Sequence, residues 1–488
     1  MPARRRTNLL FSLDKSSKVP LYQQIYQTVR SAIAEGALVE GDRLPSIRTL
    51  CRELDVSHTT IEQAYLQLSV EGYVATKPRS GYVVEHVDTE FLSMPRKEIA
   101  SQVEEVLARR SKFTFAAGQI RGKGARYNFS FADLRPGSFP ADEWRSLVGE
   151  VLYASTAKEA DRYAYADEPS LLSRELARYL GRTRGVRCVD EQVLATAGTA
   201  YALSTVLSLF DRRHDLFGME EPGYPTAVQV AHGDGFDVVP LPITGSAEVY
   251  FAALDQLRPK ILFATPSHQF PTGAVMSIDQ RTRLIRWAEE HDAYIIEDDS
   301  CNEYRYDVDP LPSLQSLDVY DRVIYLGNLS KVLSPSLRVA YLVLPPRLLD
   351  RYLDRHAHDH PTLPWIEQEV LARFIGEGLL ERQVRRMRRD MHRAHDLLED
   401  ALDAEFGDRI GLSGIGAGMH LYAAVDNGMS HDELLLSARA HDANVFGTKH
   451  MWFSKPIPEP RVMIGFSAIA LEDIAPGVAA LREAWLNK

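Results

Sequence analysis

Seven short apolar runs, each separated from the next by a helix-like stretch, constrain the fold of this chain more than any other feature. They read QVLATAG, DLFGMEE, DVVPLPI, ILFATPS, AYIIEDD, RVIYLGNLS and VAYLVLP, and they lie between residues 192 and 345. Strands that are apolar on both faces belong to sheets covered on both sides, and alternation with helices is typical of parallel strands. The pattern predicts an α/β domain with a mostly parallel sheet, which we expect to occupy residues 128–488.

A different pattern occupies residues 1–86. Apolar residues four apart predict an amphipathic helix that stops at Gly36, namely Leu21, Ile25, Val29 and Ile33. Ser46 and Ser57 stand where each can cap a further helix, and only a few residues separate these two helices. Two β-rich runs flank KPRSG and read as a hairpin. Three helices and a hairpin predict a winged helix-turn-helix.

Charge also separates these two parts of the chain. Residues 1–86 hold 11 Lys and Arg against 9 Asp and Glu, a net of +2, while the rest holds 45 against 58, a net of −13. Residues 87–127 are charged and mixed in character and are predicted to form a linker. A mildly basic unit joined to an acidic body suggests that the small unit alone meets a polyanion.

Cysteine usage and hydropathy narrow the class of protein further. Cys51, Cys188 and Cys301 form no CxxC pair, which argues against a disulfide framework and against a zinc site. No apolar run reaches membrane-spanning length, and the start MPARRRTNLLF lacks the apolar core of a signal peptide. We therefore expect a cytoplasmic protein without a membrane partner.

Two clusters of charged or metal-binding side chains have a simpler reading. The run RHAHDHP places three histidines in alternation, His356, His358 and His360, which could hold a metal. A solvated loop is the favoured interpretation, and we expect no metal. RRMRR, from Arg385 to Arg389, could bind phosphate, but on a long helix with acidic neighbours it is more often a solvated face.

Lys331 is the residue that the sequence leaves most in need of an explanation. It follows an apolar, strand-like run beside the hydroxyl group of Ser330, whereas a lysine that serves solubility belongs on a polar helix face. Arg338 lies seven positions further on and offers a planar fork to a phosphate, to which Ser330 can add its hydroxyl. Gly198, Thr199 and Ala200 stand where a strand turns into a helix, so their backbone N–H groups can also hold a phosphate.

An acidic pair completes this set. Asp298 and Asp299 end a buried strand, where one carboxylate could pair with a protonated ring nitrogen. A lysine between a phosphate cradle and such an acid is arranged to form a Schiff base, and we expect burial and nearby cations to lower its pKa. The alternative is a solvated loop lysine beside an ordinary capped helix; the occurrence of all these features at strand ends favours the first interpretation.

Several motifs resemble one family of regulators. SKVLSPSLRVAY is similar to the SKxLxPxLRxGY signature of MocR/GabR-type regulators, and EGDRLPSIRTLCRELDVSHTTIEQAYLQLSVEGY follows the GntR pattern. LRPGSFPADEW, EEPGYP, TPSHQFPTG, IIEDD and GAGMHLY follow in order, so the resemblance covers nearly the whole chain. It implies a GntR-type winged helix-turn-helix fused to a fold-type-I aminotransferase-like domain that carries pyridoxal 5'-phosphate.

The resemblance also implies roles for single residues. It makes Lys331 the Schiff-base lysine and Asp298 the partner of the pyridine nitrogen, and it places Tyr224 against the cofactor ring. The phosphate would be bound by Gly198, Thr199, Ala200, Ser330 and Arg338. His268 replaces an asparagine environment of aminotransferases and could touch the cofactor's O3' or serve only in packing.

For DNA, the second helix of the turn should enter a major groove with its first residues toward the bases. These residues are Ser57, His58, Thr59 and Thr60. Arg48 on the preceding helix fits a phosphate or base-edge contact by the same resemblance, and the expected wing contributes Lys77, Arg79, Ser80 and Gly81. GntR proteins often carry arginine where this chain has His58, which leaves the base preference open.

The substrate side of the large domain departs from amino-acid-processing relatives. Their arginine that grips the substrate carboxylate corresponds to Met463, and Arg461 could replace it only if the strand register shifted. Ser300 stands where a tyrosine usually follows the paired aspartates, and Asn328 where the lysine loop often has Ser or Thr. The pattern resembles the PdxR branch, in which pyridoxal phosphate is itself the effector and genes for its synthesis or uptake are controlled.

Four functional interpretations remain open. The leading one is a regulator of promoter DNA that responds to pyridoxal phosphate and performs no efficient transamination. The others are a regulator that senses an amino compound or a working aminotransferase with a tethering winged helix, and a pyridoxal phosphate reservoir with vestigial DNA binding. The resemblance further implies a head-to-tail, domain-swapped homodimer, since fold-type-I sites form at a dimer interface.

Overall fold

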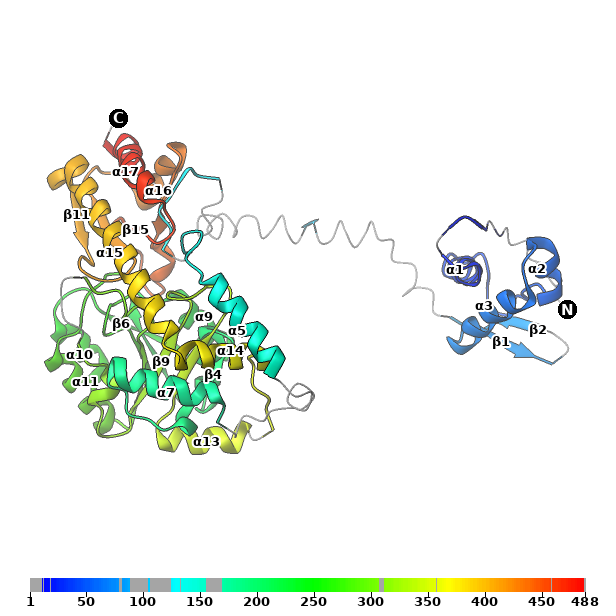
Figure 1. Cartoon of the computed structure of the whole chain (residues 1–488), viewed down its shortest axis with the longest axis horizontal. Coiled ribbons are helices and arrows are strands. Elements are labelled where there is room, and N and C mark those ends of the chain that lie inside the picture. Colours follow the sequence, from blue (N-terminus) through cyan, green and yellow to red (C-terminus); the bar gives the residue numbers. More distant parts are fainter. Residues whose placement is uncertain are drawn as a thin grey trace. The chain divides into compact units, whose positions relative to one another are not determined.

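The chain is described by a computed structural model that covers residues 11, 13–17, 19–78, 81–87, 104–105, 124–131, 133–154, 169–306, 311–356, 358–457 and 459–486. Its contacts divide it into two compact units, residues 1–114 and 115–488 (Figure 1). No helix in these described ranges is long and apolar enough to span a membrane.

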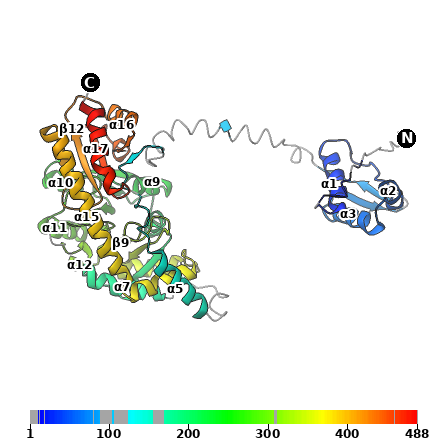
Figure 2. The same ribbon diagram turned by 45° about the horizontal axis from the view of Figure 1, so that its top comes forward.

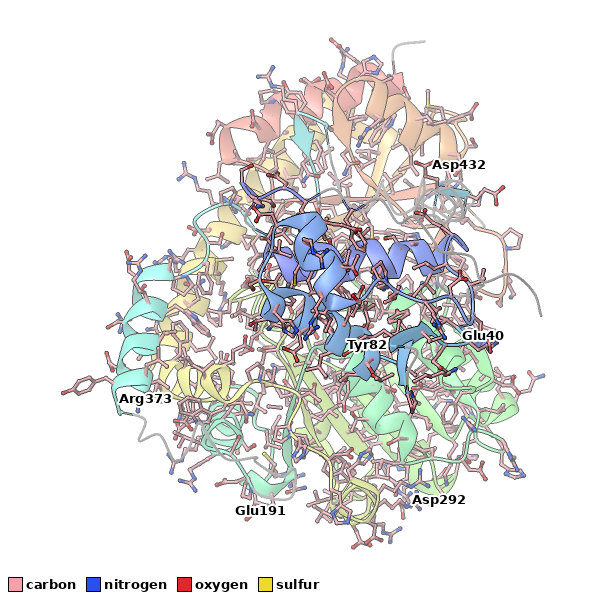
Figure 3. All side chains as sticks on the ribbon, turned by 90° about the vertical axis from the view of Figure 1, so that its right-hand side faces the viewer. Glu40, Tyr82, Glu191, Asp292, Arg373 and Asp432 are labelled. Carbon is pink, nitrogen blue, oxygen red and sulfur yellow. The ribbon has the colours of Figure 1, made fainter. Side chains whose placement is uncertain are left out.

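The first unit is built of three helices and a hairpin, as the sequence predicts. Its elements are α1 (Leu21–Ala34), α2 (Ile47–Leu54), α3 (His58–Val70), β1 (Val74–Lys77) and β2 (Gly81–Val84). The two strands pair antiparallel. Tyr82 of β2, labelled in Figure 3, lies edge-on against Tyr65 of α3 with ring centroids 4.9 Å apart. This arrangement is a winged helix-turn-helix.

Two serine caps set where the second and third helices of this unit begin. The Ser46 hydroxyl oxygen accepts the Thr49 N–H at the start of α2, and the Ser57 hydroxyl oxygen accepts the Thr60 N–H at the start of α3. Each cap satisfies a backbone donor that would otherwise lack a partner in the helix. The caps confirm both helix starts expected from the sequence.

The second unit contains a sheet of seven strands in the order β4-β10-β9-β8-β7-β5-β6. The strands are β4 (Val193–Thr196), β5 (Phe217–Glu221), β6 (Val238–Pro242), β7 (Ile261–Ala264), β8 (Tyr294–Asp298), β9 (Val323–Asn328) and β10 (Ala340–Val343). They coincide with the seven predicted runs. All neighbours are parallel except β10, which runs antiparallel to both β4 and β9. The mostly parallel sheet is therefore confirmed.

Helices cover both faces of this sheet (Figures 1 and 2). They are α5 (Ala141–Ala154), α7 (Leu171–Arg184), α8 (Thr199–Ser208), α9 (Pro225–Gly233), α10 (Ala247–Leu257), α11 (Ile278–Glu290), α12 (Leu314–Leu317), α13 (Pro346–His356) and α14 (Trp365–Gly376). Neighbouring residues of one strand point to opposite faces of the sheet. On β7, Phe263 packs in the hydrophobic cluster with α8 and α9, and Leu262 packs in the cluster with α10 and α11. This explains why the runs are apolar at every position.

A smaller antiparallel sheet follows the long helix α15 (Leu379–Phe406). Its order is β11-β12-β15-β14, with β11 (Ile410–Ser413), β12 (His420–Val425), β15 (Arg461–Gly465) and β14 (Phe446–Gly447). Helix α16 (His431–Ala440) packs against its strands β14 and β15, and α17 (Leu471–Leu486) packs against α15 and α16. A separate pair joins β3 (Tyr127–Asn128) to β13 (Ala443–Asn444). Tyr127 thus already lies in a strand, one residue before the expected start of the second domain.

Candidate cofactor and DNA sites

A pocket of about 570 Å³ lies at the carboxyl ends of β8 and β9 and the start of α8. This is where ligands bind in open α/β sheets, because the loops that follow the parallel strands converge there. Eight of the nine residues that the sequence marks for a cofactor line it, namely Thr199, Ala200, Tyr224, His268, Asp298, Ser330, Lys331 and Arg338. The ninth, Gly198, lies directly beside Arg338.

Lys331 follows β9 and its ammonium group reaches into this pocket. Its Nζ donates to the carbonyl oxygen of Phe131 at 3.1 Å and lies 5.3 Å from the centre of the Phe131 ring. Burial lowers the pKa of Lys331, while the neighbouring Cys301, Asp133 and Asp298 oppose that shift. We expected nearby cations to contribute, and that expectation was wrong: the shift comes from lost hydration. A lowered pKa increases the fraction of nucleophilic free amine.

The two aspartates at the end of β8 have different tasks. Asp299 is 1% exposed, and its carboxylate accepts two hydrogen bonds from Arg184, at 2.6 and 3.2 Å, and one from the Tyr325 hydroxyl at 2.9 Å. Asp298 has no such partner and lines the pocket, where burial raises its pKa to about 6. Only Asp298 therefore has a carboxylate available to a ligand.

A short hydrogen-bond chain fixes the Asp298 carboxylate, and the sequence did not reveal it. The amide of Asn328 donates to the Ser300 hydroxyl oxygen at 2.6 Å, and this hydroxyl donates to Asp298 Oδ1. The Ser300 N–H donates to the same Oδ1 at 3.0 Å. The sequence marks Ser300 and Asn328 only as departures from aminotransferase patterns, but both line the pocket and together they fix the position of the Asp298 carboxylate.

The start of α8 provides the expected cradle for an anion. Gly198 precedes the helix with φ of 89°, and no side chain from the described ranges caps the first N–H groups of the helix. A Cβ atom at Gly198 would lie 2.9 Å from Nη2 of Arg338, so the guanidinium group rests directly on this glycine. Backbone donors at a helix start and a guanidinium beside them are the groups that a phosphate ester needs.

Tyr224 and His268 lie on other walls of the pocket. The Tyr224 ring stacks on Phe263 with centroids 6.3 Å apart and meets Phe270 edge-on at 5.9 Å. His268 is only 8% exposed, and neither ring nitrogen has a hydrogen-bond partner among the described residues. Burial lowers its pKa to about 3, so the ring is neutral. A buried polar ring without partners is expected to bond a ligand.

His420 is a pocket residue that sequence reasoning missed. Its Nε2 donates to the carbonyl oxygen of Pro271 at 2.9 Å, and burial lowers its pKa to about 4. Because a carbonyl oxygen can only accept, Nδ1 of the neutral ring carries a lone pair. The signal was present in GAGMHLY, where His420 begins β12 directly after a glycine-rich turn.

The substrate side of the pocket has no arginine in the expected place. Met463 on β15 is fully buried in an apolar cluster that includes Tyr422, Phe446 and Phe131. Arg461 pairs with Glu459 at 2.7 Å and lies over the Tyr422 ring, beside a separate cavity of about 430 Å³. The strand register places Met463 opposite Tyr422, so Arg461 stays outside the Lys331 pocket.

These residues fit pyridoxal 5'-phosphate. The buried amine of Lys331 matches the aldehyde of this cofactor, and the Asp298 carboxylate matches its pyridine nitrogen. The start of α8 with the adjoining Arg338 guanidinium matches its phosphate. A Cβ at residue 198 would fill the cradle, which explains the glycine there. His268 supplies a buried neutral group with unused bonding capacity.

The expected DNA-contacting side chains lie mostly at the surface of the first unit. Arg48, His58 and Thr59 are exposed, but the hydroxyl groups of Ser57 and Thr60 bond each other at 2.8 Å. Ser57 is thus engaged as a helix cap before any DNA contact. In the wing, Lys77 pairs with Glu85 at 3.2 Å, and Gly81 begins β2 with φ of 73°. The remaining two candidates, Arg79 and Ser80, lie outside the described residues.

The histidine run has a structural explanation in part. At the end of α13, His356 Nδ1 donates to Asp359 Oδ2 at 2.6 Å. The other ring nitrogen, Nε2, is hydrogen-bonded to Ser208 Oγ at 3.0 Å. Across the described ranges, no three His, Cys, Asp or Glu side chains are grouped as a metal site would require.

Comparison with known proteins agrees with this geometry. Residues 21–84 match the family of bacterial regulatory proteins called gntR, and residues 134–447 match aminotransferase class I and II. The chain resembles the α-aminoadipate aminotransferase LysN of Thermus thermophilus with 27% identity and a TM-score of 0.65, over 76% of this chain and 96% of that one. Aminotransferases of this family depend on pyridoxal phosphate, which is therefore the cofactor of the second unit.

Full-length relatives share both units. The probable rhizopine catabolism regulatory protein MocR of Rhizobium meliloti is 32% identical over 97% of this chain and 95% of its own length. The pyridoxine biosynthesis transcriptional regulator PdxR of Corynebacterium glutamicum is 30% identical over 91% and 92%. With a DNA-binding winged helix-turn-helix and an aminotransferase domain in one chain, the protein belongs to the MocR-type GntR transcription regulators.

Proposed function

We propose that this regulator responds to pyridoxal 5'-phosphate itself and controls genes for the synthesis or uptake of vitamin B6. One observation carries the proposal: eight of the nine residues expected to bind the cofactor line the pocket, whereas the position from which amino-acid-processing relatives grip a substrate carboxylate holds Met463, which is fully buried and does not line the pocket. The loss of a bidentate clamp removes about 1.5–3 kcal/mol of charge-assisted binding from any amino acid. Similarity to PdxR over most of both chains supports the same reading.

In this proposal each pocket residue has one task. Lys331 supplies the amine, Asp298 holds a proton at the pyridine nitrogen, and Tyr224 covers one wall of the ring. Gly198, Thr199, Ala200, Ser330 and Arg338 bind the phosphate, and His268 bonds a ring substituent. When bound, pyridoxal phosphate supplies an aldehyde that reacts with amines and a conjugated ring that accepts electrons.

A titration of DNA affinity against cofactor tests the proposal. Fluorescence anisotropy would follow a labelled fragment of the chain's own promoter as pyridoxal phosphate is added to cofactor-free protein. We expect a saturable change in affinity for the wild type and none for Lys331→Ala. Lys455→Ala, an exposed lysine of the same unit, serves as the matched control and should respond as the wild type does.

The second candidate is a sensor or aminotransferase for an amino compound, since the reactive lysine and its acid are intact. A panel of amino acids and amines would be added to the loaded protein while its visible absorbance and DNA affinity are followed. Pyridoxal phosphate as effector predicts no specific amine response. One amine that changes both signals at micromolar concentration would replace the proposal, and a colourless protein that takes up no cofactor would refute both candidates.

We also propose that the protein acts as a head-to-tail homodimer that reads two half-sites through its two winged helices. Arg48→Ala should weaken binding to all sequences, because a phosphate contact carries no sequence information, whereas His58→Ala should alter the preference between sites. Sedimentation that gives a monomer at micromolar concentration, or wild-type affinity equal for promoter and random duplex, contradicts this arrangement.

A further inference from the structure

The first half of α15 carries a face of arginines that the proposed function does not use. We call it the arginine face and define it by Arg382, Arg385, Arg389 and Arg393, all of which are exposed. Their spacing of three, four and four residues aligns them on one side of the helix. That side is opposite the buried residues of α15, which include Leu380, Met387 and Met391. The helix lies at the surface of the second unit in both ribbon views (Figures 1 and 2).

No carboxylate neutralises this face within the described part of the chain. None of its four guanidinium groups is within ion-pair distance of an Asp or Glu side chain there. Nearby arginines behave differently: Arg182 pairs with Glu381 at 2.8 Å, and Arg178 pairs with Glu175 at 2.8 Å. The contrast is notable because residues 87–488 hold 58 acidic against 45 basic side chains.

The placement of these arginines is unfavourable for the helix itself. Arg385 and Arg389, like Arg389 and Arg393, are like charges four residues apart, which repel each other. Of the seven acidic side chains of α15, five lie in its second half, from Asp396 to Glu405, while Glu381 and Asp390 lie in the first half. A helix dipole favours the reverse order, with anions near the start and cations near the end. An arrangement that costs helix stability and has no internal partner is expected to serve an external anion.

We propose that the arginine face binds the phosphate backbone of duplex DNA that flanks the operator. Duplex DNA is favoured as the occupant because the chain already carries a GntR winged helix, which brings a polyanion to the molecule. Residues 382–393 span about 16 Å along the helix axis, over which a duplex presents a charge every ~1.7 Å. Guanidinium forks suit phosphate oxygens, and such contacts add affinity without reading sequence.

Salt dependence of binding measures these contacts directly. Full-length protein would be titrated with a short duplex that holds only the operator, and with a long one extended by about two helical turns on each side. The test variant replaces all four residues of the arginine face with Gln. On the long duplex, its slope of log affinity against log salt should be shallower by about 3 to 4, at ~0.9 per lost contact. On the short duplex it should match the wild type.

Two further variants separate contact from folding and from net charge. Replacement of the same four arginines with Lys keeps the charge and should restore the slope. The control replaces Arg212, Arg213, Arg347 and Arg355 with Gln, which removes the same charge from exposed positions elsewhere on the unit and should leave the slope unchanged.

Equal slopes for the wild type and the Gln variant on the long duplex would overturn the proposal, as would an equal loss in the control. Loss of binding to RNA or to an acidic protein, with DNA binding intact, would also overturn it and assign the face to that partner. Failure of the wild type to bind either duplex would refute DNA binding as a whole. The short duplex, which holds only the operator, distinguishes that outcome from a failure of the arginine face alone.

Discussion

Asp298 and Asp299 are neighbours in sequence, yet their conversion to asparagine should change stability in opposite directions. Asp298 lies at the pocket with its pKa raised to about 6 by burial, against an ordinary value of 3.8. A carboxyl whose pKa is raised in the folded state binds a proton more tightly there than in the unfolded chain. Its contribution is therefore unfavourable above the folded pKa and vanishes below the unfolded one.

The size of the effect follows from the shift. A difference of about two pKa units corresponds to about 3 kcal/mol of lost stability at neutral pH, as an upper value. Asp298→Asn removes this buried charge but keeps an oxygen that accepts the Ser300 N–H and hydroxyl. The free energy of unfolding of cofactor-free protein should therefore rise by up to about 3 kcal/mol near pH 7.5 and by about half of that near pH 5. Asp299→Asn leaves the buried Arg184 without its counter-charge and should cost about 3–5 kcal/mol.

Denaturant titration of cofactor-free protein, followed by tryptophan fluorescence, provides the measurement. All five tryptophans lie in the second unit, from Trp144 to Trp485, so the signal reports on that unit alone. The same Asp298→Asn variant should bind pyridoxal phosphate more weakly, because it cannot hold a proton at the pyridine nitrogen. An Asp298→Asn protein no more stable than the wild type at pH 7.5, or a gain that does not depend on pH, would refute the reasoning.

Three further outcomes are expected. Gly198→Ala should weaken cofactor binding about tenfold or more, since its backbone is in a region open only to glycine and the new Cβ meets Arg338; equilibrium dialysis measures this, and unchanged affinity would contradict the cradle. Ser57→Ala should speed hydrogen exchange in α3 about fivefold through loss of a cap worth about 1 kcal/mol, whereas Ser69→Ala should not. The His268 ring should stay neutral from about pH 8 to 5, because burial lowers its pKa to about 3. NMR measures this, and a protonation of the ring observed between pH 8 and 5 would contradict the burial of His268.

The large sheet could be predicted because its strands are buried on both faces. A run such as Ile261–Ala264 then needs apolar side chains at each position, and this leaves a plain trace in the sequence. The pocket followed from the same fact, since Asp298, Lys331 and the start of α8 each stand at a strand end. The direction of β10 could not be predicted, because an apolar run has no polarity that reveals which way its strand points.

Contacts between side chains that are far apart in the sequence could not be predicted either. Arg184 and Asp299 are 115 residues apart, and neither local sequence indicates that Asp299 accepts hydrogen bonds from this arginine. The chain from Asn328 through Ser300 to Asp298 depends on how β8 and β9 align. His420 reaches the pocket only because β12 belongs to the smaller sheet, whose short strands give weaker patterns than the seven buried runs.

The antiparallel strand β10 determines when, during synthesis and folding, the cofactor site can form. It places Ala340 opposite Thr196, 144 residues earlier in the chain, and so brings Arg338 to the start of α8. During synthesis the ribosome completes α8 well before β10, so the emerging chain has a phosphate cradle without its arginine and without Lys331. The complete phosphate site therefore forms only after β10 has been made and has paired with β4, so the cofactor can be held by all of these residues only from that stage of folding onward.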